Sequence, residues 1–278
     1  MSVMKIFGYE PNRAMLDEHP PFDAVAAPYF HQGGEVGCLV LHGIGGTPAN
    51  VRLVAEALAR EGCTVYAPLL PGHGETIRAL DRSTGAQWLH AAFAAYDRLR
   101  AAGCTKIVPI GLSLGGILAG HIAAKRGTAA LVLISAPIRM KTYLRLGRLL
   151  SPLFPYIAYS ERDKARTREL APYAQMYSGF CTRKLCDLQR LILRLRARLP
   201  RIGCPVFALW AKYDNKVSTS SRRLLRNGLR QVDLTEHTLQ NSPHGSTYGA
   251  ERDLAAELVA AYVRSTVLLP LRQTDSQA

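Results

Sequence analysis

The chain has 278 residues, of which 48% are hydrophobic and 20% are charged, and its formal net charge is +14. This apolar content is typical of a globular protein and excludes intrinsic disorder, and no repeat indicates a fibrous or low-complexity architecture. The length fits one large α/β domain or two modest ones. The positive charge makes nucleic acid, an anionic membrane surface and acidic substrates candidate partners.

The N-terminal half of the chain alternates short β-rich runs with helical patterns. The first thirty residues, rich in proline and in charges of both signs, are expected to form short antiparallel strands. Residues 38–41 predict a buried strand, and Thr47 and Pro48 suit the N-cap and first position of the helix that follows. The next predicted elements are a strand at 64–67, a helix at 88–99, a strand at 107–110, a helix at 114–126 and a strand at 130–134.

A basic segment, residues 137–201, interrupts this alternation. It contains fifteen Lys or Arg residues and four Asp or Glu residues, a net charge of +11, and no strand is predicted within it. Near its end, apolar residues recur at three- and four-residue steps at Leu185, Leu188, Ile192, Leu195 and Leu199. This spacing, with arginines between the apolar positions, predicts an amphipathic basic helix.

The α/β alternation resumes after the basic segment. The predicted elements are a strand at 206–210, a helix at 221–229, an edge strand at 232–239 and a helix at 251–263. Strands that alternate with helices indicate an α/β fold with a doubly wound, mainly parallel sheet. The predicted organisation is an α/β core formed by residues 1–136 and 202–278, into which residues 137–201 are inserted.

Residues 107–124 form the longest stretch without Asp, Glu, Lys or Arg, and at eighteen residues it approaches the length of a membrane helix. Its proline and glycines favour a strand, a tight turn and a buried helix instead.

Residues 1–5 lack the apolar core of a signal peptide, so we expect a cytoplasmic protein. The six cysteines are then expected to be buried free thiols, and their spacing does not match a zinc site.

The sequence Gly111-Leu112-Ser113-Leu114-Gly115 is a G-x-S-x-G motif between a predicted strand and a predicted helix. This context predicts a nucleophile elbow, in which a strained turn lifts the Ser113 hydroxyl above the sheet. A serine hydroxyl needs a base and an orienting acid, which follow in the order Asp then His in this arrangement. Asp214 and His244 each follow a predicted strand and fit these roles. Three other residues fit these roles less well. His121 lies inside a predicted helix, His237 lies within a predicted strand, and Asp233 lies before the body of that strand.

A second glycine-rich loop follows the first buried strand at His42 and Gly43. At this place the same arrangement supplies a donor for the oxyanion of the tetrahedral intermediate. We therefore expect the backbone N–H groups of Ile44 and Leu114 to bind substrate there. The His42 ring is expected to brace the loop, and His73 to be structural.

These motifs resemble the α/β-hydrolase superfamily, and within it the small bacterial carboxylesterases and monoacylglycerol-lipase-like enzymes. The resemblance spans about residues 36–265 and rests on Leu41-His42-Gly43-Ile44-Gly45-Gly46-Thr47, Leu70-Pro71-Gly72-His73-Gly74, the Ser113 motif, Asp214 and Asn241-Ser242-Pro243-His244. It implies ester hydrolysis through an acyl-enzyme and a small helical cap between the sixth and seventh strands, where the basic segment falls. The leucines of the cap would line the acyl pocket together with Tyr143, Phe154, Tyr156 and Tyr173.

The leading hypothesis is a serine carboxylesterase that hydrolyses short- to medium-chain acyl esters, monoacylglycerols included, without a metal or cofactor. A thioesterase whose basic cap binds the phosphates of an acyl-CoA is the enzymatic alternative. A non-catalytic hydrolase-fold protein that binds membrane or nucleic acid through the basic segment is less favoured, because a binding module needs no triad and no nucleic-acid motif is present. We expect no integral membrane association, and an anionic interface is a candidate contact for the basic cap.

Overall fold

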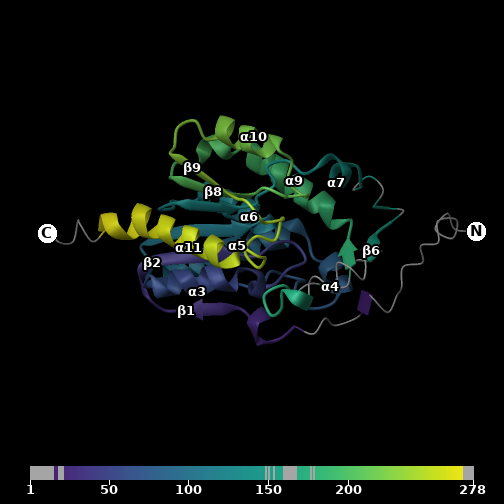
Figure 1. Cartoon of the computed structure of the whole chain (residues 1–278), viewed down its shortest axis with the longest axis horizontal. Helices are drawn as coiled ribbons and strands as arrows, with labels where there is room; N and C mark the ends of the chain where they lie inside the picture. Colours follow the sequence, from purple (N-terminus) through teal and green to yellow (C-terminus); the bar gives the residue numbers. More distant parts are fainter. Residues whose placement is uncertain are drawn as a thin grey trace, which may run out of the picture.

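A computed structural model of the chain describes residues 16–17, 22–147, 149, 151–152, 154–158, 168–175, 177 and 179–271. Within these residues, seven strands form one sheet in the order β1-β3-β2-β4-β5-β8-β9 (Figure 1). Only β1 (Tyr29–His31) is antiparallel to its neighbour in this sheet, and every other neighbouring pair is parallel. The predicted mainly parallel sheet is confirmed. Most of the N-terminal region expected to hold short antiparallel strands lies outside the described residues.

The predicted strands and helices of the core all form, with ends that differ by a few residues from the predicted ones. The parallel strands are β2 (Gly34–Leu41), β3 (Cys63–Ala67), β4 (Lys106–Leu112), β5 (Leu131–Ile134), β8 (Val206–Ala211) and β9 (Leu234–Leu239). The α-helices are α3 (Arg52–Arg60), α4 (Ile77–Arg82), α5 (Gly85–Ala101), α6 (Leu114–Ala123), α10 (Ser220–Gly228) and α11 (Arg252–Val263). Short 3-10 turns are η1 (Ala24–Ala26), η2 (Pro48–Val51) and η4 (Leu199–Arg201), and a π-helical turn, η5 (Arg264–Leu268), extends α11.

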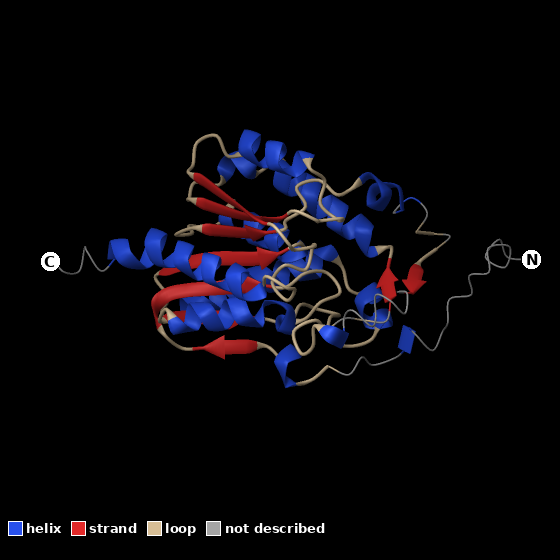
Figure 2. Ribbon diagram, viewed as in Figure 1, coloured by secondary structure: helices blue, strands red, loops and turns tan. Residues whose placement is uncertain are grey.

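Helices cover both faces of the sheet, which is drawn in red in Figure 2. On one face α3 and α11 pack together against Val and Ile side chains of β2, β4 and β5. On the other face α5 and α6 pack together, and α9 (Lys184–Arg196) packs on both of them. The central strands β5 and β8 are buried along their whole length, as expected for parallel strands between two helical layers.

The basic segment lies between β5 and β8 and contains α7 (Thr142–Gly147), β6 (Tyr156–Ala158), β7 (Gly179–Cys181) and α9. The prediction that it holds no strand is wrong, because β6 and β7 pair antiparallel in a separate two-stranded sheet. Each strand is three residues long, too short for an alternating pattern to show in the sequence. The expected position between the sixth and seventh strands is also wrong for the main sheet. Among the described residues β1 is the one strand before β2, so the segment follows the fifth strand of that sheet and precedes the sixth, β8.

The amphipathic basic helix is confirmed as α9. Its buried face consists of Lys184, Leu185, Leu188, Leu191, Ile192 and Leu195. The predicted periodicity breaks after Ala197, and Leu199 is buried in the separate turn η4. The arginines between the apolar positions lie largely on the exposed side of the helix.

The apolar stretch at residues 107–124 forms β4, the Ser113 turn and α6, as predicted. The six cysteines are free, and all but the half-buried Cys186 are buried.

The continuous helix from Arg252 to Leu271 is long and apolar enough to cross a membrane by length and composition alone. Its Ala and Val residues, however, pack against α3 in the core.

Candidate active site

The order of the strands reverses between β2 and β4, because the chain runs from β2 to β3 on one side and returns to β4 on the other. Ligands of doubly wound sheets bind at the carboxyl ends of the strands beside such a reversal. Leu41, the last residue of β2, pairs with Gly111 near the end of β4. The loop after β2 and the turn after β4 therefore meet at this edge.

Ser113 occupies the turn between β4 and α6 in a strained conformation, with φ of 53° and ψ of −113°. Its N–H donates to the Ile134 carbonyl at 2.8 Å, which holds the turn against β5. The flanking glycines are sterically required. A Cβ atom on Gly111 would lie 2.1 Å from the Gly115 carbonyl carbon, and one on Gly115 would lie 2.1 Å from the Leu41 oxygen. The predicted elbow is thus present, and backbone crowding explains both glycines of the motif.

The structure brings the three predicted catalytic side chains together from three separate loops. His244 Nε2 lies 2.9 Å from Ser113 Oγ, and His244 Nδ1 lies 2.9 Å from Asp214 Oδ2. Asp214 follows β8 and His244 follows β9, so both reach the edge of the sheet where Ser113 lies. The three side chains form one continuous hydrogen-bonded chain.

Asp214 is held as a carboxylate. Burial by itself would raise the pKa of this group, but the hydrogen bond from His244 and the N–H groups of Val217 and Lys216 keep its pKa below 3.8. Those amides donate to Asp214 Oδ1 at 2.9 Å and 2.7 Å. A carboxylate can only accept, so His244 carries its proton on Nδ1 and turns the lone pair of Nε2 toward the Ser113 hydroxyl.

The two predicted oxyanion donors lie beside Ser113. Ile44 follows Gly43, whose Cα is close enough that a Cβ there would be 3.5 Å from Ser113 Cβ. Leu114 is the first residue of α6, where an N–H has no partner within the helix. Within the described residues, neither N–H donates to a protein acceptor. Of the two residues, Ile44 lines the cavity that contains Ser113.

His42 braces this loop as predicted. Its Nδ1 donates to the Gly43 carbonyl at 2.9 Å, and its Nε2 accepts from the Leu70 N–H at 3.1 Å. Burial lowers the pKa of His42 to about 4. His73 packs edge-on against His42 and donates from Nδ1 to the Pro71 carbonyl. Both rings are neutral structural groups that position the loop preceding Ile44.

The competing residues lie elsewhere. His121 is buried inside α6 and donates to the Leu191 carbonyl of α9 at 3.0 Å. His237 lies within β9, paired in register with Leu209, and Asp233 directly precedes that strand. None of the three lines the cavity that contains Ser113.

Ser113 and His244 line a cavity of about 390 Å³ whose wall is largely apolar. The basic segment supplies much of this wall, including Met140, Tyr143, Leu144, Phe180, Leu185 and Leu188. Of the four aromatic residues expected in the acyl pocket, only Tyr143 lines it. Tyr156 instead donates its hydroxyl to Asp81, the Tyr173 ring lies beneath Arg252, and Phe154 is absent from the lining.

Two residues that hold the site together were not predicted from the sequence. Asn50 accepts from the Thr47 N–H, donates to the Tyr173 carbonyl at 2.8 Å and accepts on its own carbonyl from the Thr247 hydroxyl. Glu251 accepts from the amides of Gln240 and Asn241 and from the Ser242 hydroxyl, which fixes the loop before His244. The T-x-x-N spacing of Thr47 and Asn50, a capping box, is the one signal that could have identified Asn50.

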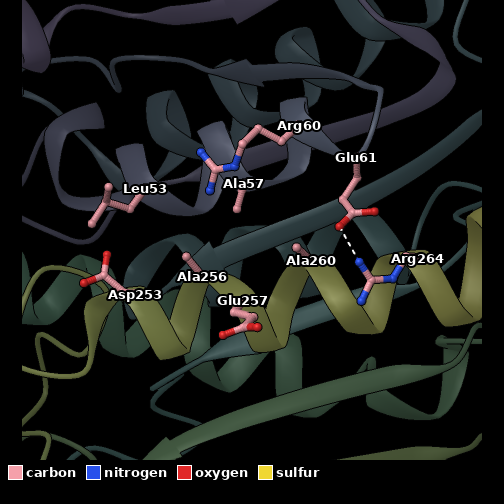
Figure 3. Close-up of a pocket in the computed structure, with 9 residues that line it drawn as sticks. All are labelled: Leu53, Ala57, Arg60, Glu61, Asp253, Ala256, Glu257, Ala260 and Arg264. Carbon is pink, nitrogen blue, oxygen red and sulfur yellow. Dashed lines mark hydrogen bonds and ion pairs between the residues drawn. The ribbon is translucent and has the colours of Figure 1, made fainter.

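A second cavity, of about 370 Å³, lies between α3 and α11 (Figure 3). Its floor is formed by Ala57, Ala256 and Ala260, and charged side chains surround it, with an ion pair of 2.6 Å between Glu61 and Arg264. The lining shares no residue with the Ser113 cavity and contains no serine, cysteine or histidine.

Comparison with known proteins identifies the fold family. A model of the alpha/beta hydrolase family matches residues 38–261, most of the chain. The chain belongs to the alpha/beta hydrolase family. The predicted resemblance and the predicted fold class are both confirmed.

Among the similar proteins are two Bacillus enzymes. A thermostable monoacylglycerol lipase of Bacillus sp. (strain H-257) is 29% identical over 245 residues, covering 87% of this chain and 96% of the lipase. A carboxylesterase of Bacillus subtilis (strain 168) is 26% identical over 237 residues, covering 85% of this chain and 95% of the esterase. A solved structure from work on two metagenome-derived lipolytic enzymes, LipS and LipT, superposes with a TM-score of 0.77 at 26% identity, covering 87% of this chain and 98% of that one. These relatives support the predicted class of enzyme, a carboxylic ester hydrolase.

Proposed function

We propose that the protein is a serine carboxylesterase that hydrolyses short- to medium-chain acyl esters, monoacylglycerols included, through an acyl-enzyme. Ser113 is the nucleophile, His244 the general base and Asp214 the residue that orients and stabilises the imidazole. The observation that carries this proposal is the hydrogen-bonded chain from Ser113 Oγ through the His244 ring to Asp214, with 2.9 Å at each link. The names of the Bacillus relatives support the ester substrate class.

In this mechanism His244 Nε2 takes the proton of Ser113 Oγ as the oxygen attacks the ester carbonyl. The negative charge that develops on the carbonyl oxygen is stabilised by the N–H groups of Ile44 and Leu114. His244 then donates its proton to the leaving alkoxide, and the acyl group remains on Ser113. Water, deprotonated by His244, releases the acid and regenerates the free serine.

The test is a kinetic profile over p-nitrophenyl esters from acetate to palmitate, with Ser113→Ala as the matched variant. Loss of the serine in a catalytic triad lowers kcat by about 10⁴-fold or more while the fold is retained. An organophosphonate should label the wild type on Ser113 alone. Covalent labelling of another residue, or full activity in Ser113→Ala, would refute the assignment.

The thioesterase alternative is tested with the same preparations. Matched acyl-CoA and p-nitrophenyl substrates of equal chain length separate the two activities. A kcat/KM that is much higher for the thioester than for the ester would replace the esterase by a thioesterase that uses the same triad.

We further propose that residues 137–201 form a cap on the core and that its exposed cations attract an anionic interface. Arg194 and Arg196 are exposed on α9 and pair with no acid among the described residues, which supports this role. Attraction of this kind is screened within about 8 Å at physiological salt. Activity on anionic micelles should therefore fall with added NaCl more than activity on p-nitrophenyl butyrate, and the double variant Arg194→Gln/Arg196→Gln should remove the difference.

A further inference from the structure

Lys216 lines the Ser113 cavity but belongs neither to the triad nor to the apolar wall. Lys216 is the only lysine, arginine or carboxylate among the described residues that line the cavity. Its side chain is exposed, and it forms no ion pair with any residue that the structure describes. Only its backbone N–H serves the triad, through the hydrogen bond to Asp214. The ammonium group is therefore free to bind a ligand.

The surroundings of Lys216 are positively charged. The loop after β8 is joined to the start of the basic segment by a backbone bridge between Met140 and Val217 and by a 2.9 Å hydrogen bond from the Lys141 N–H to the Lys216 carbonyl. Together, residues 139–147 and 211–218 carry the cations Arg139, Lys141, Arg145, Lys212 and Lys216. Their only carboxylate is Asp214, which is nearly buried and bonded to His244.

An anion in this cavity meets Lys216 among the lining residues, and neither of the two segments carries a free carboxylate that would repel it. A neutral ester gains nothing from this charge. The wall itself, formed by residues such as Leu144 and Leu188, requires that the rest of the substrate be apolar.

We propose that Lys216 binds a carboxylate or phosphate group carried by the ester substrate, so that the site favours anionic esters over neutral esters of the same size. This inference rests on the proposed esterase function. The anionic group belongs either to the acyl chain or to the leaving alcohol, and the two sources are separated by experiment.

The experiment measures kcat/KM for two matched pairs of esters. The acyl-side pair is p-nitrophenyl hydrogen adipate and p-nitrophenyl hexanoate, and the alcohol-side pair is p-butyryloxybenzoate and its methyl ester. In Lys216→Gln, the ratio of anionic to neutral kcat/KM should fall about threefold to fivefold in one pair, the effect of one partly exposed ion pair. Lys216→Arg should restore most of the ratio. The pair that responds identifies which part of the substrate carries the anion.

The matched control is Arg223→Gln, which removes one exposed cation of α10 that does not line the cavity. Its ratios should equal those of the wild type. The wild-type preference should also decline as NaCl rises from about 0.01 M to about 1 M, because the Debye length shortens from about 30 Å to about 3 Å.

Three results decide the matter. Unchanged ratios in both pairs for Lys216→Gln, or an equal fall in Arg223→Gln, would overturn the inference while the esterase function stands. Absence of Ser113-dependent hydrolysis of all four esters would refute the esterase function and this inference with it. A fall confined to Lys216→Gln and reversed in Lys216→Arg supports the proposal.

Discussion

Mild acid is expected to destabilise the protein through its buried histidines. Burial lowers the pKa of His42 to about 4 and, with Arg198 nearby, lowers the pKa of His121 to about 4 as well. Burial also lowers the pKa of His73 well below 6.5. The unfolded chain titrates these groups at about 6.5. Between about pH 6.5 and pH 4 the unfolded state therefore binds more protons than the folded state, and the free energy of unfolding falls as the pH falls.

The magnitude follows from the two pKa values of each residue. Going from about pH 7.5 to about pH 5, one histidine with a pKa of about 6.5 unfolded and about 4 folded lowers the free energy of unfolding by about 2 kcal/mol. His42 and His121 together give about 4 kcal/mol, and His73 adds in the same direction. A domain of this kind has about 5–15 kcal/mol in total. We therefore expect the stability of the protein to be severely reduced by about pH 5.

Urea unfolding followed by tryptophan fluorescence at a series of pH values measures this loss. His121→Gln isolates one contribution, since the amide can still donate to the Leu191 carbonyl. This variant should show a slope of free energy against pH that is smaller by about 1.2 kcal/mol per pH unit near pH 5.5. His90→Gln, at an exposed position on α5, is the control and should keep the wild-type slope. A wild-type stability that is flat from about pH 7.5 to pH 5 would refute the reasoning.

Three substitutions test the local geometry of the site. Asp214→Asn keeps an acceptor for the Val217 and Lys216 amides but cannot fix the proton on His244 Nδ1, so kcat for p-nitrophenyl esters should fall about 10⁴-fold with little change in melting temperature. Gly115→Ala places a Cβ 2.1 Å from the Leu41 oxygen and should lower the free energy of unfolding in urea by about 1–3 kcal/mol or more, whereas Gly127→Ala, with open space around it, should be neutral. Asn50→Ala leaves the Thr47 N–H and the Tyr173 carbonyl without their partner, and thermal melts should show a loss of about 1–3 kcal/mol.

The sequence was sufficient to predict that Ser113, Asp214 and His244 lie together, because the signals for their positions are local. The G-x-S-x-G motif, directly between a strand and a helix, fixes the place of Ser113, and the crowding at Gly111 and Gly115 shows why the motif has that form. Asp214 and His244 follow from the order of the chain and from the rule that ligand sites lie at the ends of parallel strands. Each of these inferences uses only residues near one strand end.

The unpredicted parts depend on contacts between distant residues. Asn50 bonds to Tyr173 and Thr247, which are 123 and 197 residues away along the chain. The direction of an aromatic side chain in the basic segment is equally non-local: Tyr143 lines the cavity, whereas Tyr156 turns to Asp81 of α4. The strands β6 and β7 pair with each other and bond to Asp81 of α4, and neither has a sequence pattern of its own.

The residues proposed to carry the reaction and the residues that shape the cavity come from different parts of the chain. Ser113, Asp214, His244 and the Ile44 loop all come from the ends of core strands, while the apolar wall over them comes largely from residues between β5 and β8. The wall is tied to the core by the packing of α9 on α5 and α6 and by polar groups. Asp81 accepts from Tyr156 and Cys181 and pairs with Arg183, and the buried Lys184 bonds to the Ser83 carbonyl. These anchors come from α4 and the residue after it, whereas the bridge between Met140 and Val217 ties the wall to the loop that holds Asp214. Because the residues that shape the cavity differ from those proposed to carry the reaction, the substrate must be inferred from the cavity itself.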